Sequence, residues 1–389
     1  MRQTVLKAAP IALAVAAFSS ASFASDPMTE QRLNAIQQQI NALQTANVRF
    51  NGFLSTGYAR ADNNVGFDGI TEKTSVIDLS LFALQGTFRV SDKSQAVVQI
   101  VGRGADDWEP IVEWAYLSHR PTNNLQVRAG KMRLPFFMYS DSLEVGYAQP
   151  WVRPPEAVYG PISITSYVGA DATYTFNFDG SSVNAQLFGG FTDEEGSVGT
   201  AELRNLGGAT LEWTDFTWTL RAVAATAETT IDATPRLGQV ISQADRGNFY
   251  GIGASYDDGS LQIIGEVTRV EVDGIFADTD SAYVSVGHRF GTVTPYAKVG
   301  WIESKDDKER QGVVFSTPLG PAPGNFLDTR RDEYSLGARW DITPGVALKA
   351  DWTHARNFRT DPGGLDAGFV RSTGTNSTNV YTFKLDSAF

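Results

Sequence analysis

The 389-residue sequence contains no cysteine and only three histidines. Without cysteine the chain can form neither disulfides nor thiolate metal sites. After residue 24 no apolar run is long enough for a membrane-spanning helix. The formal net charge is −12, whereas a protein that binds nucleic acids needs a surplus of basic residues. These absences exclude disulfide-stapled, thiolate-metal and nucleic-acid-binding proteins.

Residues 1–24 have the pattern of a secretory signal peptide. Arg2 and Lys7 supply the positive start, residues 8–18 supply the apolar centre, and small residues near Ala24 supply a cleavage site. An N-terminal helix buried in the protein is the alternative. The pattern predicts export, and cleavage would make the mature chain more acidic.

Residues 25–47 have the pattern of a helix. Asp26 can cap its start and Pro27 suits its first position. Its apolar positions follow heptad spacing and comprise Leu33, Ile36, Ile40 and Leu43. A helix this short is marginal alone in water and needs a partner. We expect a coiled coil between subunits, and the mixture of isoleucine and leucine favours more than two helices. A helix packed on its own chain, or a loosely ordered arm, are the alternatives.

From residue 48 to residue 389 apolar and polar side chains alternate, as they do along a β-strand. Leu348 and Trp352, for example, alternate with Lys349 and Asp351. Seven short and eight long breaks separate about 16 such segments of roughly ten residues each. This predicts an all-β transmembrane antiparallel barrel with short turns at one rim and long loops at the other. A soluble β-sandwich or β-solenoid explains neither the regular loop asymmetry nor the persistent apolar face.

The terminal segment extends the pattern, with Tyr381, Phe383, Leu385 and the final Phe389 on one face. Here the sequence resembles Gram-negative outer-membrane porins, whose last strand ends on an aromatic residue. Ser387 departs from the porin pattern, in which an apolar residue is usual. The helix ahead of the barrel is similar to that of trimeric porins with a periplasmic coiled coil, such as DcaP-type channels. The resemblance implies outer-membrane lipid, a homotrimer and small hydrophilic solutes as partners, and no cofactor.

The third long break, Leu134 to Gly160, is too long for an ordinary loop and too aromatic for a linker. Its prolines exclude a long helix or a central strand. The resemblance implies that this loop folds into the barrel and narrows it.

The charged residues that strand parity turns inward and those on this loop together predict a pore constriction. Its candidate residues are Arg103, Arg128, Lys131, Arg133, Asp141, Glu144, Arg153 and Glu156. A basic wall facing an acidic loop would create a transverse field, and a basic surplus would weakly favour anions such as carboxylates. Ion pairs that hold the loop to the wall are the alternative for each residue. Because Lys131 and Arg133 have lipid-facing parity, we expect a bulge or the strand end at Gly130.

Other functions find less support in the sequence. His119, His288 and His354 are the only imidazole bases, and no G-x-S-x-G nucleophile motif is present, so we expect no enzyme. No folded domain is available as a plug or adhesin, although a plugged structural or adhesive barrel stays the main alternative to a channel. A less favoured alternative is an outer-membrane hydrolase. Acidic outer loops such as residues 306–309 could bind calcium, but we expect solvated charges and no metal site.

Overall fold

The computed structural model describes residues 47–162, 164–195, 200–232, 240–317 and 320–389. The chain divides into two units, residues 1–47 and 48–389. The expected signal peptide, and the expected coiled-coil helix except for Asn47, lie outside the described residues. Among the residues that are described, no helix is both long enough and apolar enough to cross a membrane.

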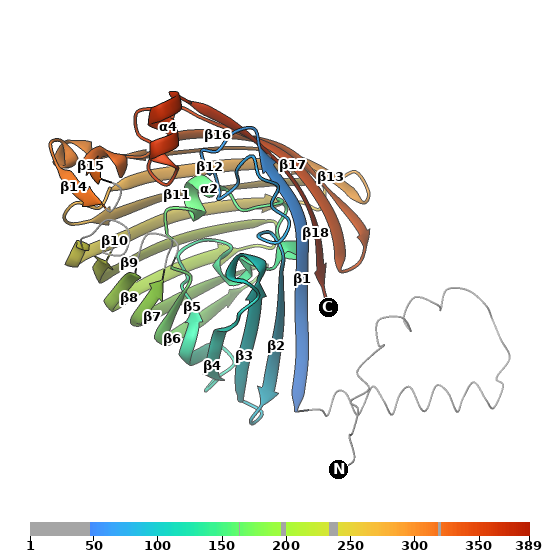
Figure 1. Ribbon diagram of the computed structural model, residues 1–389. Helices are drawn as coiled ribbons and strands as arrows, with labels where there is room; N and C mark the ends of the chain where they lie inside the picture. The colour runs from blue at the N-terminus through green and yellow to red at the C-terminus, as the bar shows by residue number, and fades with distance from the viewer. Residues whose placement is uncertain (1–46, 163, 196–199, 233–239, 318–319) are drawn as a thin grey trace, which may run out of the picture. The chain divides into compact units, whose positions relative to one another are not determined.

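The second unit is a closed barrel in which every strand pairs antiparallel with its neighbours (Figure 1). β1 closes the ring by pairing with β18, so that Phe53 lies opposite Ala388. The strands of the barrel are β1 Val48–Ala61, β2 Leu81–Arg89, β3 Ser94–Arg103, β4 Pro110–His119, β5 Leu125–Arg133, β6 Ser166–Phe178, β7 Ser181–Glu195, β8 Thr200–Thr214, β9 Trp218–Asp232, β10 Val240–Asp257, β11 Leu261–Val272, β12 Thr279–His288, β13 Val293–Ser304, β16 Arg330–Thr343, β17 Val346–Arg356 and β18 Ser377–Ala388. The predicted 16-stranded barrel is confirmed.

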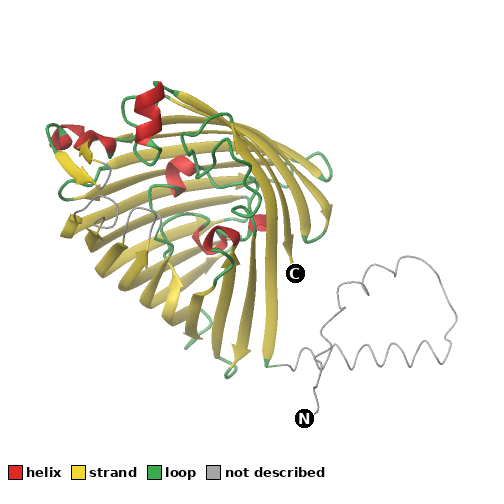
Figure 2. Cartoon of the chain, viewed as in Figure 1, coloured by secondary structure: helices red, strands yellow, loops and turns green. Residues whose placement is uncertain are grey.

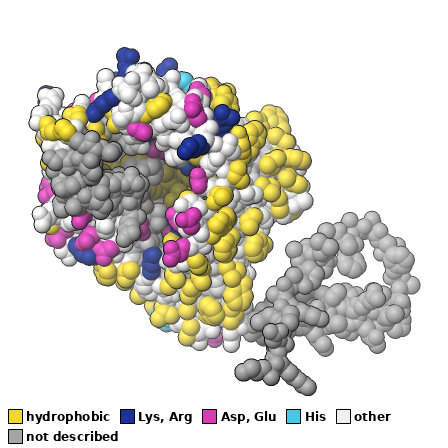
Figure 3. All heavy atoms as spheres, viewed as in Figure 1, with side chains coloured by type: hydrophobic (Ala, Val, Ile, Leu, Met, Phe, Trp, Pro, Cys, Tyr) yellow, Lys and Arg dark blue, Asp and Glu magenta, His cyan; other side chains and the backbone are white. Residues whose placement is uncertain are grey.

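The barrel wall follows the predicted alternation. In β12 and β13, Val284 and Val299 face outward, whereas Ser285 and Lys298 are buried inside. Apolar side chains therefore cover the outer wall, as the visible face in Figure 3 shows. Exposed aromatic residues gather toward both rims, among them Phe88, Tyr174, Trp218 and Trp340 near the short turns and Tyr58, Trp108, Tyr250 and Trp301 near the long loops. Such an apolar band between aromatic girdles matches a lipid bilayer.

The breaks between strands also alternate as predicted, with short turns at one rim and long loops at the other. Strand length is less uniform than the expected ten residues. β2 has 9 residues, whereas β10 has 18. β7 to β10 extend into what the sequence pattern suggested were long loops, so the connections 196–199 and 233–239 are shorter than expected.

The remaining elements lie in the loops (Figure 2). In the part of the chain that the structure describes, the helices are α2 Glu156–Tyr159 and α4 Ala367–Thr373, and short 3-10 turns occupy Gly104–Asp106, Ser140–Ser142, Gly146–Ala148, Asp307–Arg310 and Gly324–Phe326. A hairpin of β14 Val314–Thr317 and β15 Gly320–Pro323 forms a separate small sheet. Asp366 caps α4 by accepting a hydrogen bond from the backbone N–H of Phe369, and Gly374 ends it in the left-handed conformation.

Candidate functional site: a loop fixed inside the barrel

The segment that joins β5 to β6 is described over residues 134–162 and 164–165, where it lies inside the barrel, and we call it the inward loop. α2 within it contacts β11, β12, β13 and β16. Trp151 at its centre is fully buried, and its indole N–H donates to Ser285 Oγ on β12 at 2.6 Å. The backbone N–H of Val152 donates to the Tyr296 hydroxyl on β13 at 3.1 Å. The loop therefore crosses the lumen and binds the opposite wall.

Basic side chains of the wall bind the carbonyl oxygens of the inward loop. Lys349 Nζ on β17 donates to the carbonyls of Gly146, Gln149 and Trp151 at 2.5, 2.7 and 3.0 Å. Arg339 on β16 donates to the Gln149 carbonyl at 2.9 Å. A non-helical loop leaves many carbonyl oxygens without a backbone partner. These basic side chains supply the hydrogen-bond donors that backbone N–H groups provide in a helix or sheet. The ammonium of Lys349, fully buried, also pairs with Asp386 on β18 at 3.0 Å.

A buried carboxylate on β11, Glu266, joins both ends of the inward loop. It accepts hydrogen bonds from the Tyr159 hydroxyl at 2.5 Å and the Met138 backbone N–H at 2.9 Å. The Tyr283 hydroxyl on β12 donates to it as well, at 2.8 Å. A carboxylate that accepts several hydrogen bonds can be buried without an ion pair. Glu266 therefore acts as a structural anchor for the loop.

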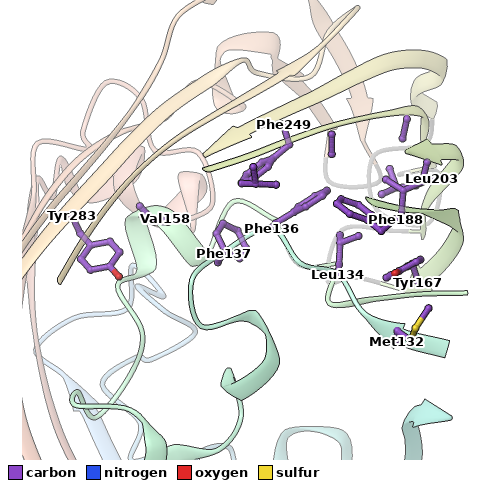
Figure 4. Packing of buried hydrophobic residues seen from close by; sticks show 14 of the residues in the cluster. Met132, Leu134, Phe136, Phe137, Val158, Tyr167, Phe188, Leu203, Phe249 and Tyr283 are labelled. Atoms are coloured by element: carbon purple, nitrogen blue, oxygen red, sulfur yellow. The ribbon is translucent and has the colours of Figure 1, made fainter. Parts of the chain in front are cut away.

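Aromatic packing completes the attachment. Phe136 stacks on Phe249 of β10 with ring centroids 4.3 Å apart, and it lies between Phe137 and Phe188 in Figure 4. These residues belong to the largest buried apolar cluster, which extends along the inner wall to Leu203 of β8. Stacked or edge-to-face aromatic pairs contribute about 0.5–1.5 kcal/mol each beyond the burial of apolar area. The start of the inward loop is therefore held by apolar contacts and its middle by charged donors.

Three of the predicted constriction residues form one ionic network with a fourth residue, Glu113 of β4. Arg103 on β3 binds both Glu113, at 2.6 Å, and Glu144 of the inward loop. Arg133 on β5 binds the same two carboxylates at 3.2 and 2.5 Å. Two guanidinium groups thus face these two carboxylates, and Asp106, just after β3, lies 3.9 Å from Arg103 as a third. It ties the inward loop to the β3–β5 wall.

The bulge that allows this network lies on β4 rather than at Gly130. The register between β3 and β4 shifts between Gln99 and Ile100, which leaves Glu113 as the extra residue. β5 continues past Gly130 to Arg133 with no register shift against β4 or β6, so the prediction of a bulge or strand end at Gly130 is wrong. Gly130 is nevertheless distinctive, because its φ of 138° suits glycine and an added Cβ would lie 2.3 Å from the carbonyl oxygen of Ala115.

Arg128 lies farther toward the short-turn rim and pairs with Asp171 of β6. Its Nη2 lies 2.6 Å and its Nε 3.0 Å from the carboxylate oxygens of Asp171. The guanidinium also lies 5.4 Å from the centroid of the Tyr116 ring. Asp171 also accepts hydrogen bonds from Gln186 Nε2 at 3.1 Å and from the Tyr167 hydroxyl at 3.3 Å. Asp171 therefore holds Arg128 in one orientation. Asp171 is not among the predicted constriction residues, although strand parity also turns it inward.

The other nominated residues divide between pairs and open positions. Arg153 pairs with Asp68 of the first outer loop, residues 62–80, at 2.7 Å, and Glu156 pairs with Arg331 of β16. Asp141 is exposed on the inward loop, close enough to Arg128 to act on it electrostatically. Lys131 joins no ion pair found in the described part of the chain, and its ammonium donates to the Val112 carbonyl at 3.0 Å.

The acidic loop residues 306–309 do not form a purely solvated cluster. Asp306 binds both terminal nitrogens of Arg310, at 2.6 and 2.8 Å, and Asp328 binds its Nε. The nearby carboxylates raise the pKa of Arg310 further above its ordinary value, against the opposing effect of burial. Within the described ranges, no three His, Asp or Glu side chains are arranged to hold a metal ion.

Known structures resemble this barrel. OmpTdeltaL8, a loop-deletion mutant of the outer membrane protein OmpT of Vibrio cholerae, aligns with a TM-score of 0.58 at 14% identity, over 88% of this chain and 99% of its own. An anion-selective porin from Comamonas acidovorans aligns at 0.54 and 16% identity, covering 88% and 99%. OmpF of Salmonella typhi aligns at 0.58 and 12% identity, covering 88% and 97%.

No family model and no curated protein matches the sequence. At these identities the likeness to solved structures shows the fold, which is that of a porin-type outer-membrane barrel. The apolar outer band with its aromatic rims fits the same location, the outer membrane of a Gram-negative bacterium.

Proposed function

We propose that the protein is a passive diffusion channel for small hydrophilic solutes, without enzymatic activity. The observation that carries the proposal is the closed barrel, apolar outside and lined inside by charged and amide side chains, with an inward loop at its centre. In this proposal Arg103, Arg128, Arg133, Asp141 and Glu144, on or beside β3–β5 and the inward loop, line the narrowest part of the solute path. Lys131, Arg153 and Glu156 complete the proposed constriction.

Solute permeation tests the channel directly. Liposomes that contain the folded protein should swell in isotonic solutions of small sugars and organic acids, faster for smaller solutes. Control liposomes carry the same protein after heat unfolding, which removes the barrel but not the polypeptide. Absence of swelling with every small solute, from protein shown to be folded, would reject the channel.

We further propose that selectivity is weak, with anions such as carboxylates slightly preferred. Arginine forks suit carboxylates, and one of the similar structures is an anion-selective porin. The preference is small because Glu113, Asp171 and Asp68 neutralise most of the arginines. Charges on the outer loops beyond about 8 Å are screened at physiological salt. Reversal potentials in a salt gradient measure the preference, and a clear cation preference would reject it.

The oligomer is proposed to be a trimer joined partly by residues 25–47. Leu33, Ile36, Ile40 and Leu43 would form the seam of a periplasmic coiled coil. Deleting residues 26–46 should lower the temperature at which the oligomer dissociates in detergent. A variant with Gln37, Gln38 and Gln39 changed to Glu keeps the seam and serves as the control. Equal dissociation temperatures for all three proteins would contradict the coiled coil.

A plugged structural barrel is the second candidate, and the many bonds from the wall to the inward loop favour it. Conductance in planar bilayers distinguishes the two. Stable current steps support the channel, whereas a folded barrel that inserts without steps supports the plug.

A further inference from the structure

The barrel contains a partly open cavity at its long-loop end, and the lining of this cavity differs from that of the rest of the lumen. Its volume is about 560 Å³, within the ~300–1,000 Å³ range typical of small-molecule sites. Its walls come from the long-loop ends of β8, β9, β10, β11, β12, β13 and β16. Phe136, Ile162 and Ile164 of the inward loop also line it.

The side chains that line this cavity are mostly apolar, although strand parity turns them into the lumen. Leu203 and Ala227 on the wall belong to one apolar cluster with Phe136 of the inward loop, and Val272 of β11 and Phe276 of the loop 273–278 also line the cavity. In Figure 4 the side chains of Leu203 and Phe249 lie on the same side of the barrel wall as the ring of Phe136. On β3–β6 the inward apolar residues, such as Val101 and Met132, alternate with charged and amide side chains, among them Gln99, Arg103, Arg128 and Asp171. A water-filled passage alone gives no reason for such a lining.

Charge indicates what the cavity can hold. Among its lining residues only Glu156 and Arg331 are ionisable, and they pair with each other. Arg331 also binds Glu333 at 3.2 Å, so two carboxylates already neutralise its charge. An anionic or cationic ligand would lose hydration without gaining a partner here. The cavity is therefore complementary to an uncharged molecule.

We propose that this cavity is a binding site for a small, uncharged and largely apolar molecule, which is held above the inward loop. Burial of a ring-sized apolar group against Leu203, Phe136 and Ala227 provides the affinity. Binding at this site does not require the barrel to conduct, so the proposal goes beyond the diffusion function and can be tested separately.

The absence of cysteine from the sequence allows a direct test. Single cysteines are introduced as Ala227→Cys in the cavity and Thr173→Cys elsewhere in the lumen, on β6. Purified folded barrels are treated with benzyl methanethiosulfonate, which is uncharged, or sulfonatoethyl methanethiosulfonate, which is anionic. The cysteine thiolate attacks the divalent sulfur of the reagent, forms a mixed disulfide with its benzylthio or sulfonatoethylthio group, and releases methanesulfinate as the S–S bond of the reagent breaks. Labelling rates are measured with and without naphthalene as the probe ligand.

The ratio of the benzyl labelling rate to the anionic labelling rate should be roughly tenfold higher in Ala227→Cys than in Thr173→Cys, because the cavity concentrates apolar molecules. Naphthalene should slow benzyl labelling of Ala227→Cys and leave Thr173→Cys unchanged. Adding Ala225→Phe, which fills the cavity, should abolish this protection. The neighbouring Ala224→Phe faces outward and should preserve it.

Equal reagent ratios at the two positions, or no protection by naphthalene, would overturn the proposal. If Ala227→Cys reacts with neither reagent, the cavity is occupied by the chain itself or by lipid, and the proposal also fails. Swelling assays on the same proteins report conduction independently, so failure of this site is distinguishable from failure of the channel.

Discussion

Two long loops of this barrel are ordered in opposite ways. The inward loop, residues 134–165, binds side chains that lie far away in sequence, such as Lys349 and Glu266. The hairpin loop, residues 305–329, is ordered mainly by its own residues, with Arg310 bound to Asp306 and Asp328. Its contacts outside the loop go mostly to other outer loops, such as the carbonyls of Ile275 and Phe276 and the backbone N–H groups of Asp278 and Gly363, with Ser304 at the end of β13 as a further partner.

The difference has a physical consequence. A loop whose carbonyls are satisfied by the opposite wall couples its position to the stability of the barrel. A loop that satisfies its own charges can open locally while the barrel stays folded, since local opening free energies differ across a structure. Length and polarity alone do not separate the two cases, but the location of the binding partners does.

The largest expected effect comes from Lys349→Met. The change removes three hydrogen bonds to the inward loop and leaves Asp386 buried without its closest cation. Breaking a buried pair from one side costs about 3–5 kcal/mol. We expect a lower unfolding temperature in detergent, and noisier, larger current steps if the channel conducts.

Lys384→Met is the matched control, because Lys384 lies 3.5 Å from Asp386 and inside the same barrel. In the described residues no hydrogen bond joins its ammonium to the inward loop. If Lys349→Met unfolds and conducts as Lys384→Met does, the bonds from Lys349 do not fix the loop.

The second effect should be large locally and small globally. Arg310 is buried at the centre of the hairpin loop. Arg310→Met therefore leaves Asp306 and Asp328 without the guanidinium that both of them bind. Chymotrypsin should cut near Phe315 and Phe326 at least tenfold faster, which corresponds to about 1.4 kcal/mol of easier local opening. The unfolding temperature of the barrel should change little.

Lys308→Met serves as the control, since Lys308 is an exposed cation of the same loop. Cleavage of Arg310→Met at the rate of this control would show that the network does not order the loop. A matching fall in barrel stability would show that the hairpin loop is coupled to the wall after all.

Much of the fold could be predicted because its rules are local. Strand parity requires only neighbouring residues, so it places Leu348 outside and Lys349 inside. The length and aromatic content of residues 134–160 distinguish the inward loop in the same way. The structure extends that connection to residue 165 because β6 begins only at Ser166.

The partners of the candidate site could not be predicted to the same degree. Strand parity already turns Glu113 toward the lumen, but no sequence motif marks the bulge on β4 beside which it meets Arg103 and Arg133. Asp68 reaches Arg153 from a different outer loop. The sequence-based count of basic over acidic residues at the constriction therefore omitted carboxylates that only the fold brings into contact.

The smallest expected effect concerns the contact between the first outer loop and the inward loop. Burial raises the pKa of Asp68 from 3.8 to about 6, although Arg153 opposes the shift. The folded state thus binds this proton more tightly than the unfolded chain. The resulting contribution to stability is present below about pH 4 and is lost as pH rises through about 6. Acidification therefore weakens the ion pair with Arg153 without destabilising the barrel through Asp68.

At pH 5 the freed guanidinium of Arg153 should raise the anion-to-cation permeability ratio by less than about twofold, because nearby charges remain and salt screens the rest. Asp68→Asn should show the raised ratio already at pH 7.5 and should lose most of its change between pH 7.5 and 5. Asp78→Asn, in the same outer loop, is the control, since Asp78 accepts its hydrogen bond from Ser75. Reversal potentials of the three proteins at both pH values decide the matter. If Asp68→Asn retains the full pH response of the unmodified chain, another group titrates, and the contact between the two loops has no part in selectivity.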